Sequence, residues 1–202
     1  MTKQDTYYSL KNVSEGLYKE KGSKFLAFAY PVVSEEEIME KLEALKKQYY
    51  DARHHCFAYM LKPEEGREET YRASDDGEPA HSAGDPILGQ IRSQKLHDVL
   101  VVVVRYFGGT KLGVSGLIQA YKTAAAEAFA HNQIVEKVVY KPLNIRFEYT
   151  STNEVMQILE QFRIQLDQQD YTEDCFYQLS VPRSSWQMAK EQFSQLTGVY
   201  IV

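Results

Sequence analysis

The sequence is poor in the features that mark several specialised classes of protein. Its two cysteines, Cys56 and Cys175, lie far apart and form no Cys-x-x-Cys pair, so they predict neither a disulfide framework nor a thiolate zinc site. The longest strongly apolar run covers residues 99–104, far short of the roughly 20 residues of a membrane helix. The start of the chain has no apolar stretch typical of a secretory signal. We therefore expect a cytoplasmic protein with no membrane partner.

An excess of positive charge is also missing. The chain has 23 Lys and Arg against 28 Asp and Glu, a formal net charge of −5. Because phosphate binding depends on Lys and Arg, this charge excludes a protein that is basic all over but not one with a local basic surface. What is present is ordinary globular composition, 44% hydrophobic and 25% charged over 202 residues. A chain of this size buries roughly 70% of its unfolded surface and needs no disulfide or metal to form a core.

The first part of the chain alternates strand and helix patterns. We expect two strands within residues 15–33 around a Lys-Gly-Ser-Lys turn, and a helix after Ser34, which forms a capping box with Glu37. A strand is expected over 53–61, irregular structure over 68–86, and a helix that begins with Asp85 as N-cap and Pro86 as its first residue. Residues 98–106 are apolar on both faces, as in a central strand, and a helix is expected over 117–130.

The pattern changes near residue 135. Strands are expected over 138–149, 164–171, 174–181 and 199–202, with helices over 152–162 and 185–196 and a second capping box at Ser151 and Glu154. This βαββαβ order is that of a ferredoxin-like domain. The sequence therefore predicts an α+β protein with a β/α domain at 1–135 and a ferredoxin-like domain at 136–202.

The densest functional signal is the stretch Arg-Tyr-Phe-Gly-Gly-Thr-Lys-Leu-Gly-Val-Ser-Gly at 105–116, between the buried strand and a helix. Gly108, Gly109 and Gly113 permit positive φ and close backbone approach. Together with Arg105 and Lys111, the free amides of the following helix predict an anion site. The spacing is that of neither a Walker A nor a GxGxxG motif. The alternative is a tight crossover in which the glycines serve packing alone.

A second signal is an acidic loop at 73–85. Its carboxylates and imidazole are Asp75, Asp76, Glu78, His81 and Asp85. Oxygen-rich loops can hold Mg²⁺ or Ca²⁺, but this spacing does not match an EF-hand. We favour an ordered surface loop with Asx turns and expect no metal.

A third signal is Arg53-His54-His55-Cys56 at the start of a strand. Alternation places His54 and Cys56 on one face, which leaves a Cys–His nucleophile open as an alternative. A cysteine in such a strand is more often a small buried apolar residue. We therefore expect no catalytic residues.

Several of these stretches together resemble the IMPACT family in its bacterial two-domain form. They are ARHHCFAY (52–59), SDDGEPAHSAGDPIL (74–88), VVVVRYFGGTKLGVSGL (101–117) and the small C-terminal domain. The resemblance implies a first domain similar to a β/α fold shared by a small-subunit ribosomal protein and domain IV of elongation factor G. It implies a second domain similar to the ferredoxin-like domain V of that factor. Eukaryotic relatives regulate translation by competing for the partner that activates a stress kinase.

The leading hypothesis is a translation-linked protein that binds RNA or the ribosome, with a translation-associated protein as a further partner and no cofactor. Phosphate would be contacted by Arg53, Arg105, Gly108, Gly109, Lys111 and Gly113, helped by Lys95 and Lys122. The alternative is an enzyme acting on a small phosphorylated or nucleotide-like substrate. Small-molecule kinases of the GHMP type share the broad first-domain fold, and Asp75, Asp76 or Glu78 would then bind Mg²⁺ or act as a base. A third hypothesis is a protein-interaction regulator that contacts no nucleic acid.

Overall fold

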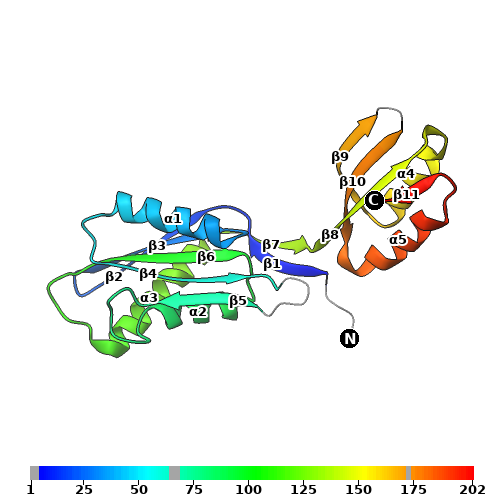
Figure 1. The fold of residues 1–202 in the computed structure, drawn as a ribbon. Coiled ribbons are helices and arrows are strands. Elements are labelled where there is room, and N and C mark those ends of the chain that lie inside the picture. Colours follow the sequence, from blue (N-terminus) through cyan, green and yellow to red (C-terminus); the bar gives the residue numbers. More distant parts are fainter. Residues whose placement is uncertain (1–4, 64–68, 172–173) are drawn as a thin grey trace. The chain divides into compact units, whose positions relative to one another are not determined.

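The computed structural model describes residues 5–63, 69–171 and 174–202, which form two compact units (Figure 1). The N-terminal unit is Tyr8–Glu136, and the C-terminal unit is Lys137–Val202 together with the chain up to Tyr7. Strand β1 (Thr6–Leu10) and strand β7 (Ile134–Val138) form a two-stranded sheet. The protein is thus of mixed α/β type with two units, while the domain limits 1–135 and 136–202 stay a prediction.

A five-stranded antiparallel sheet forms the centre of the N-terminal unit. Its order is β2 (Ser14–Glu20), β3 (Ser23–Pro31), β6 (Val99–Tyr106), β4 (His54–Leu61) and β5 (Thr70–Ser74). Helix α1 (Glu35–Gln48) covers one face, and helices α2 (Gly84–Ser93) and α3 (Gly113–Ala130) cover the other (Figure 1). This arrangement explains why β6 is apolar on both faces.

The two faces of β6 bury alternate valines. Val99, Val101 and Val103 pack with α2 and α3, whereas Val102 and Val104 pack with α1. Helix α3 meets the sheet through small side chains, Ala120, Ala124, Ala125 and Ala128, which are fully or almost fully buried. The expected central strand and its close-packed helix are both present.

The C-terminal unit has the expected βαββαβ element order. Its elements are β8 (Tyr140–Phe147), α4 (Thr152–Gln161), β9 (Gln165–Tyr171), β10 (Cys175–Pro182), α5 (Trp186–Gln195) and β11 (Val199–Ile201). Short 3₁₀ turns, Tyr149–Ser151 and Arg183–Ser185, precede the two helices. The antiparallel sheet has the order β11-β8-β10-β9 and buries one face against both helices. No helix among the described residues is both long and apolar enough to span a membrane.

Three local expectations were wrong in an informative way. Helix α2 begins at Gly84, and its first amides are capped not by Asp85 but by Asp75, whose Oδ1 accepts from Ala83 N (2.9 Å) and Gly84 N (2.8 Å). Ser151 occupies the N-cap position of α4 as predicted, but it makes no side-chain capping bond, because its hydroxyl donates to the carbonyl of Thr197 at 3.0 Å. Strand β5 lies inside the segment expected to be irregular. In contrast, the Ser34 cap is confirmed, since its Oγ accepts from Glu37 N at 3.3 Å.

Candidate functional site

The glycine-rich loop spans residues 107–112 and joins β6 to α3. Gly109 and Gly113 have φ of 88° and 73°. These left-handed conformations strain any residue with a Cβ, so glycine is required at both positions although open space surrounds them. The glycines therefore shape the backbone here and do not merely fill a packed crossover.

Gly108 has a different role, because it touches the β2–β3 turn. A Cβ at Gly108 would lie 1.9 Å from the carbonyl carbon of Gly22, and its amide donates to Ser23 Oγ at 3.1 Å. Ser23 is fully buried. The two backbones are thus in direct contact, which brings the lysines of the β2–β3 hairpin beside the loop.

The N-terminus of α3 is open to an anion. Leu112 occupies the N-cap position and makes no side-chain capping bond, and the first turn contains no acidic residue. Lys111, immediately before it, is exposed. Uncapped amides at the positive end of an 18-residue helix favour negative charge.

Arg105 is not on this surface, contrary to the expectation that it contacts phosphate directly. Its side chain is 8% exposed and forms an ion pair and hydrogen bond with Glu78, which is 4% exposed. The guanidinium carbon lies 5.4 Å from the ring centre of Phe25 and 5.7 Å from that of Phe107. Arg105 therefore supports the loop residue Phe107 from inside the unit.

The other predicted cations lie at different ends of the sheet. Arg53 is exposed and directly precedes β4, whose first residue, His54, pairs with Arg105. It therefore shares the loop end of the sheet. Lys95 precedes β6, whereas the loop follows it, so eight residues of strand, roughly 25 Å, separate Lys95 from the loop.

Cys56 belongs to a buried polar cluster behind the loop. Its Sγ lies 3.0 Å from the carbonyl oxygen of Asp75, to which the thiol can donate, and 3.3 Å from Tyr121 Oη, and Tyr121 donates to Glu78 Oε1 at 2.8 Å. Burial raises the pKa of the Cys56 thiol to about 12. Because a thiol of that pKa stays protonated near neutrality, the structure does not support a Cys–His nucleophile.

The acidic loop is held together by its own carboxylates. Asp75 accepts three backbone amides, from His81, Ala83 and Gly84. Burial raises the pKa of Asp75, but these bonds outweigh burial, and the net pKa is lowered. In the described part of the chain, no three His, Cys, Asp or Glu side chains form a group suited to a metal ion.

Histidines on β4 and within the acidic loop make the remaining contacts of its carboxylates and backbone. Asp76 accepts the amide of His55 at 2.6 Å, and its carbonyl lies 2.8 Å from His54 Nδ1. Burial lowers the pKa of His55. His81 Nδ1 lies 2.6 Å from Asp85 Oδ2 on the surface. Through Glu78 and Arg105 the acidic loop thus meets the end of β6, just before the glycine-rich loop, and the carboxylates of the acidic loop already have protein partners.

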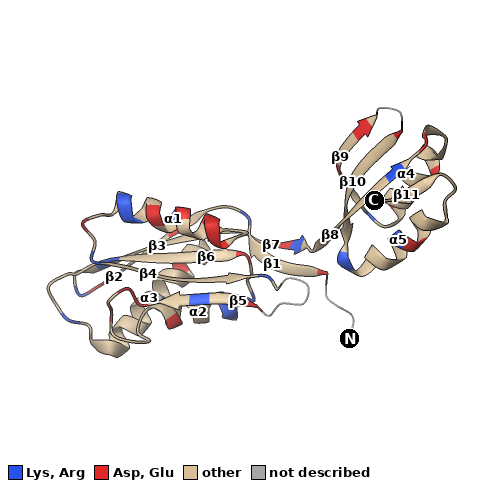
Figure 2. Cartoon of the chain, viewed as in Figure 1, with Lys and Arg blue, Asp and Glu red and all other residues tan. Residues whose placement is uncertain are grey.

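Basic residues gather at the loop end of the N-terminal unit (Figure 2). Exposed lysines come from the β2–β3 hairpin (Lys19, Lys21, Lys24), from the last turn of α1 (Lys46, Lys47) and from the loop (Lys111). The hairpin lysines are candidate functional residues that the sequence patterns did not indicate. The Lys-Gly-Ser-Lys turn was the available signal, but nothing local shows that it touches Gly108.

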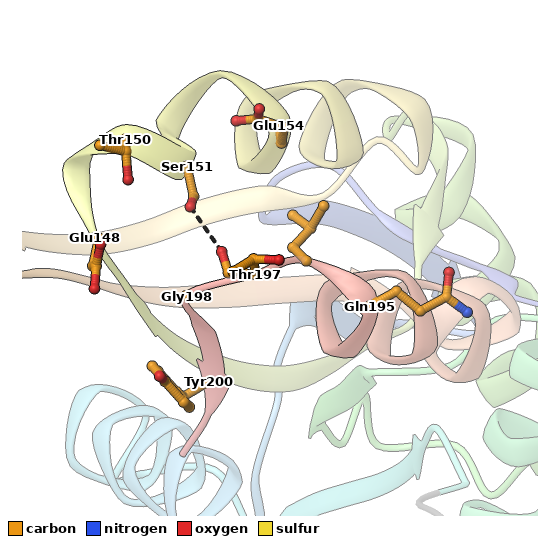
Figure 3. A pocket seen from close by; sticks show the side chains of 9 residues that line it. Glu148, Thr150, Ser151, Glu154, Gln195, Thr197, Gly198 and Tyr200 are labelled. Atoms are coloured by element: carbon orange, nitrogen blue, oxygen red, sulfur yellow. Dashed lines mark hydrogen bonds between the residues drawn. The ribbon is translucent and has the colours of Figure 1, made fainter.

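A separate hollow lies in the C-terminal unit (Figure 3). It is about 510 Å³ in volume and lies between the start of α4 and the segment before β11. The residues that line it include the carboxylates Glu148 and Glu154, with Tyr200 at one side. Carboxylates without a cation do not fit a phosphate ligand, so this hollow does not extend the site.

Comparison with known proteins shows where the chain belongs. The Impact N-terminal domain matches residues 21–129. The Bacillus subtilis (strain 168) protein named IMPACT family member YvyE is 30% identical over 193 residues, covering 96% of this chain and 88% of that protein. A Thermus thermophilus protein named IMPACT family member in pol 5′region is 48% identical over 106 residues, covering 52% of this chain and 54% of that protein.

A solved structure agrees in fold along the chain. A crystal structure described only as that of an hypothetical protein has a TM-score of 0.71 and 23% sequence identity, covering 99% of this chain and 98% of that chain. The matched family region contains the hairpin turn, the acidic loop and the glycine-rich loop. On this evidence the chain belongs to the IMPACT family.

Proposed function

We propose that this protein is a cytoplasmic, translation-linked regulator that binds RNA, free or in the ribosome, at the loop end of its N-terminal unit. The observation that carries the proposal is the open N-terminus of α3, which is preceded by exposed Lys111 and flanked by the β2–β3 hairpin. Backbone amides and several lysines there offer local positive charge on a chain whose net charge is −5.

Arg53, Lys111 and the amides of Gly109 and Gly113 are the proposed phosphate contacts. The amide of Gly108, also predicted from the sequence, already donates to Ser23 Oγ and is left out. Arg105 takes a positioning role in this proposal, because its charge is matched by Glu78 inside the unit. The same proposal relates the N-terminal unit to the β/α fold of elongation factor G domain IV. The antiparallel order β11-β8-β10-β9 supports a ferredoxin-like C-terminal unit like domain V of that factor. No observation favours the enzyme alternative, since Asp75, Asp76 and Glu78 are engaged by protein donors.

A salt titration of RNA binding tests the proposal. We expect Lys21→Ala with Lys111→Ala to weaken binding of a short RNA and to lower the slope of log K against log salt by about 0.7–0.9 for each lost phosphate contact. Lys95→Ala, at the other end of β6, is the matched control and should leave both quantities unchanged. Equal affinity and slope in the double variant and the wild type would show that this surface does not bind RNA.

Co-sedimentation with ribosomes separates the RNA hypothesis from a protein partner. We expect association to disappear after nuclease treatment and to fall in the Lys21→Ala, Lys111→Ala variant. Association that survives removal of RNA would favour a translation-associated protein as the partner.

A further inference from the structure

A groove beside the glycine-rich loop has no role in the proposal above. It lies on the α1 face of the sheet, where α1 ends and leaves the hairpin uncovered, and has a volume of about 510 Å³. Leu17 and Leu26, which pair across β2 and β3, form its apolar floor. We call it the hairpin groove, with walls formed by Lys19, Lys24, Tyr49, Tyr106 and Phe107.

Two lysines of the hairpin groove stand directly opposite each other. Lys19 pairs with Lys24 across β2 and β3, and like charges in that position destabilise a sheet. Neither lysine forms an ion pair within the described residues, and Lys21 is exposed in the turn between them. An anion bound at the hairpin would remove this repulsion, so the charge pattern fits a negatively charged occupant.

The aromatic side chains in the walls of the hairpin groove indicate what the occupant contains besides negative charge. Tyr106 pairs with Lys24 across β3 and β6, and Phe107 is 55% exposed although it is a large apolar side chain. Arg105 supports Phe107 from the interior, with its guanidinium carbon 5.7 Å from the ring centre. Tyr106 donates a hydrogen bond to Asp51 Oδ1 at 2.7 Å, which raises the pKa of its hydroxyl to about 12. Like any tyrosine near pH 7, Tyr106 therefore presents a neutral ring. Flat neutral rings held beside lysines suit an aromatic group that carries phosphate.

We propose that the hairpin groove binds an unstacked base of single-stranded RNA, with its flanking phosphates on Lys19, Lys21 and Lys24. This inference rests on the proposed function and narrows it to a class of RNA. A duplex hides its bases, so exposed rings could not stack on them, whereas loops and single strands can insert a base. Lysines outside the groove, such as Lys111, continue the positive charge beyond one nucleotide, which favours a strand over a free nucleotide.

A comparison of single-stranded and duplex RNA tests the groove separately from the loop. We expect Phe107→Ser to weaken binding of single-stranded RNA about 5- to 150-fold, the usual contribution of one stacked base, and to leave binding of a duplex unaffected. The salt slope should stay the same in Phe107→Ser, because no phosphate contact is lost. Lys19→Ala with Lys24→Ala should instead lower the single-strand slope by about 0.7 for each contact.

Phe107→Trp provides the rescue and a direct readout. This variant should restore single-strand affinity, and its indole emission should be quenched when a base stacks on it. Wild-type protein, whose one tryptophan is Trp186 in the C-terminal unit, is the control for quenching elsewhere.

The outcomes distinguish the two proposals. Unchanged single-strand affinity in Phe107→Ser, together with weaker binding in Lys111→Ala, would overturn the groove and leave the proposed function standing. Equal loss for single strands and duplex in Phe107→Ser would also overturn it, because that result indicates a damaged loop. If the wild type binds neither RNA, both proposals fail, and capture of a protein by the groove would replace them.

Discussion

At the scale of single residues, the environment of Arg105 decides what it can do. Its position beside a glycine-rich loop suggests an exposed phosphate ligand, but the side chain is buried with Glu78 as its carboxylate partner. Tyr121 donates to the same carboxylate oxygen at 2.8 Å. One ion pair therefore joins the acidic loop to the end of β6, far apart in sequence, and the charge of Arg105 stabilises the fold near the surface where Lys111 is exposed.

This arrangement predicts a large cost for neutralising Glu78. Glu78→Gln keeps the shape of the side chain but leaves the charge of Arg105 buried without a partner, so we expect the free energy of unfolding to fall by about 3–5 kcal/mol. Denaturant unfolding measures the change. Glu127→Gln, an exposed position on α3, is the control and should change stability by less than about 0.5 kcal/mol. A loss as small as that of the control would mean that the ion pair adds little to stability.

At the scale of elements, helix α2 shows how a start site depends on another segment. The sequence predicts Asp85 as N-cap, but Asp75 reaches the first amides from eight and nine positions earlier in the chain. That contact requires Gly84 to lie against β5, where a Cβ would be 2.5 Å from the amide nitrogen of Ser74. Local propensity identifies this helix, whereas packing against a neighbouring strand determines how it begins.

Replacement of two glycines of helix α2 by alanine should therefore change the stability of the protein in opposite directions. Gly84→Ala forces a Cβ into the backbone of Ser74 and should destabilise the protein by about 1–3 kcal/mol. Gly89 is exposed, and a Cβ there would meet nothing within 4 Å, so Gly89→Ala should stabilise the helix by about 0.5–1 kcal/mol. Thermal unfolding of the two variants measures both signs. If both variants were destabilised, the space available to a Cβ atom would not determine how these two positions respond.

At the scale of the whole molecule, the buried apolar residues form separate hydrophobic cores in the two units. The core of the C-terminal unit includes Ile145, Phe147, Tyr177 and Phe193, and shares no residue with the two clusters of the N-terminal unit. Because each unit has a hydrophobic core of its own, the free energy of unfolding of each unit is a separate quantity.

Hydrogen exchange can measure this separation. Phe193 is fully buried, and Phe193→Ala should lower the free energy of exchange in the C-terminal unit by about 3–5 kcal/mol. Amides of β3, β6 and α3 should keep their protection. Met188→Ala, on the same helix with a side chain that is 53% exposed, is the control and should change neither unit. An equal loss of protection in both units would show that they unfold as one.

Much of the architecture follows from the sequence alone. Residues 99–106 are apolar at every position but the last two, which predicts a strand covered on both faces, and the alanine stripe after residue 117 predicts a helix packed closely on it. The βαββαβ order of the C-terminal unit and the Ser34 cap are equally local. Such features are predictable because periodicity and capping depend on residues a few positions apart.

Tertiary structure alone decided which distant groups meet. The contact of Gly22 with Gly108, the ion pair of Glu78 with Arg105 and the pairing of Lys24 with Tyr106 all follow from the strand order β2-β3-β6-β4-β5. Each contact joins residues 27 or more positions apart, and nothing in either local segment encodes its partner. Sequence by itself therefore determined the elements and a charged glycine-rich loop. The order of the strands, set by how both faces of β6 are buried, decided that Arg105 turns inward while the hairpin lysines form the surface beside that loop.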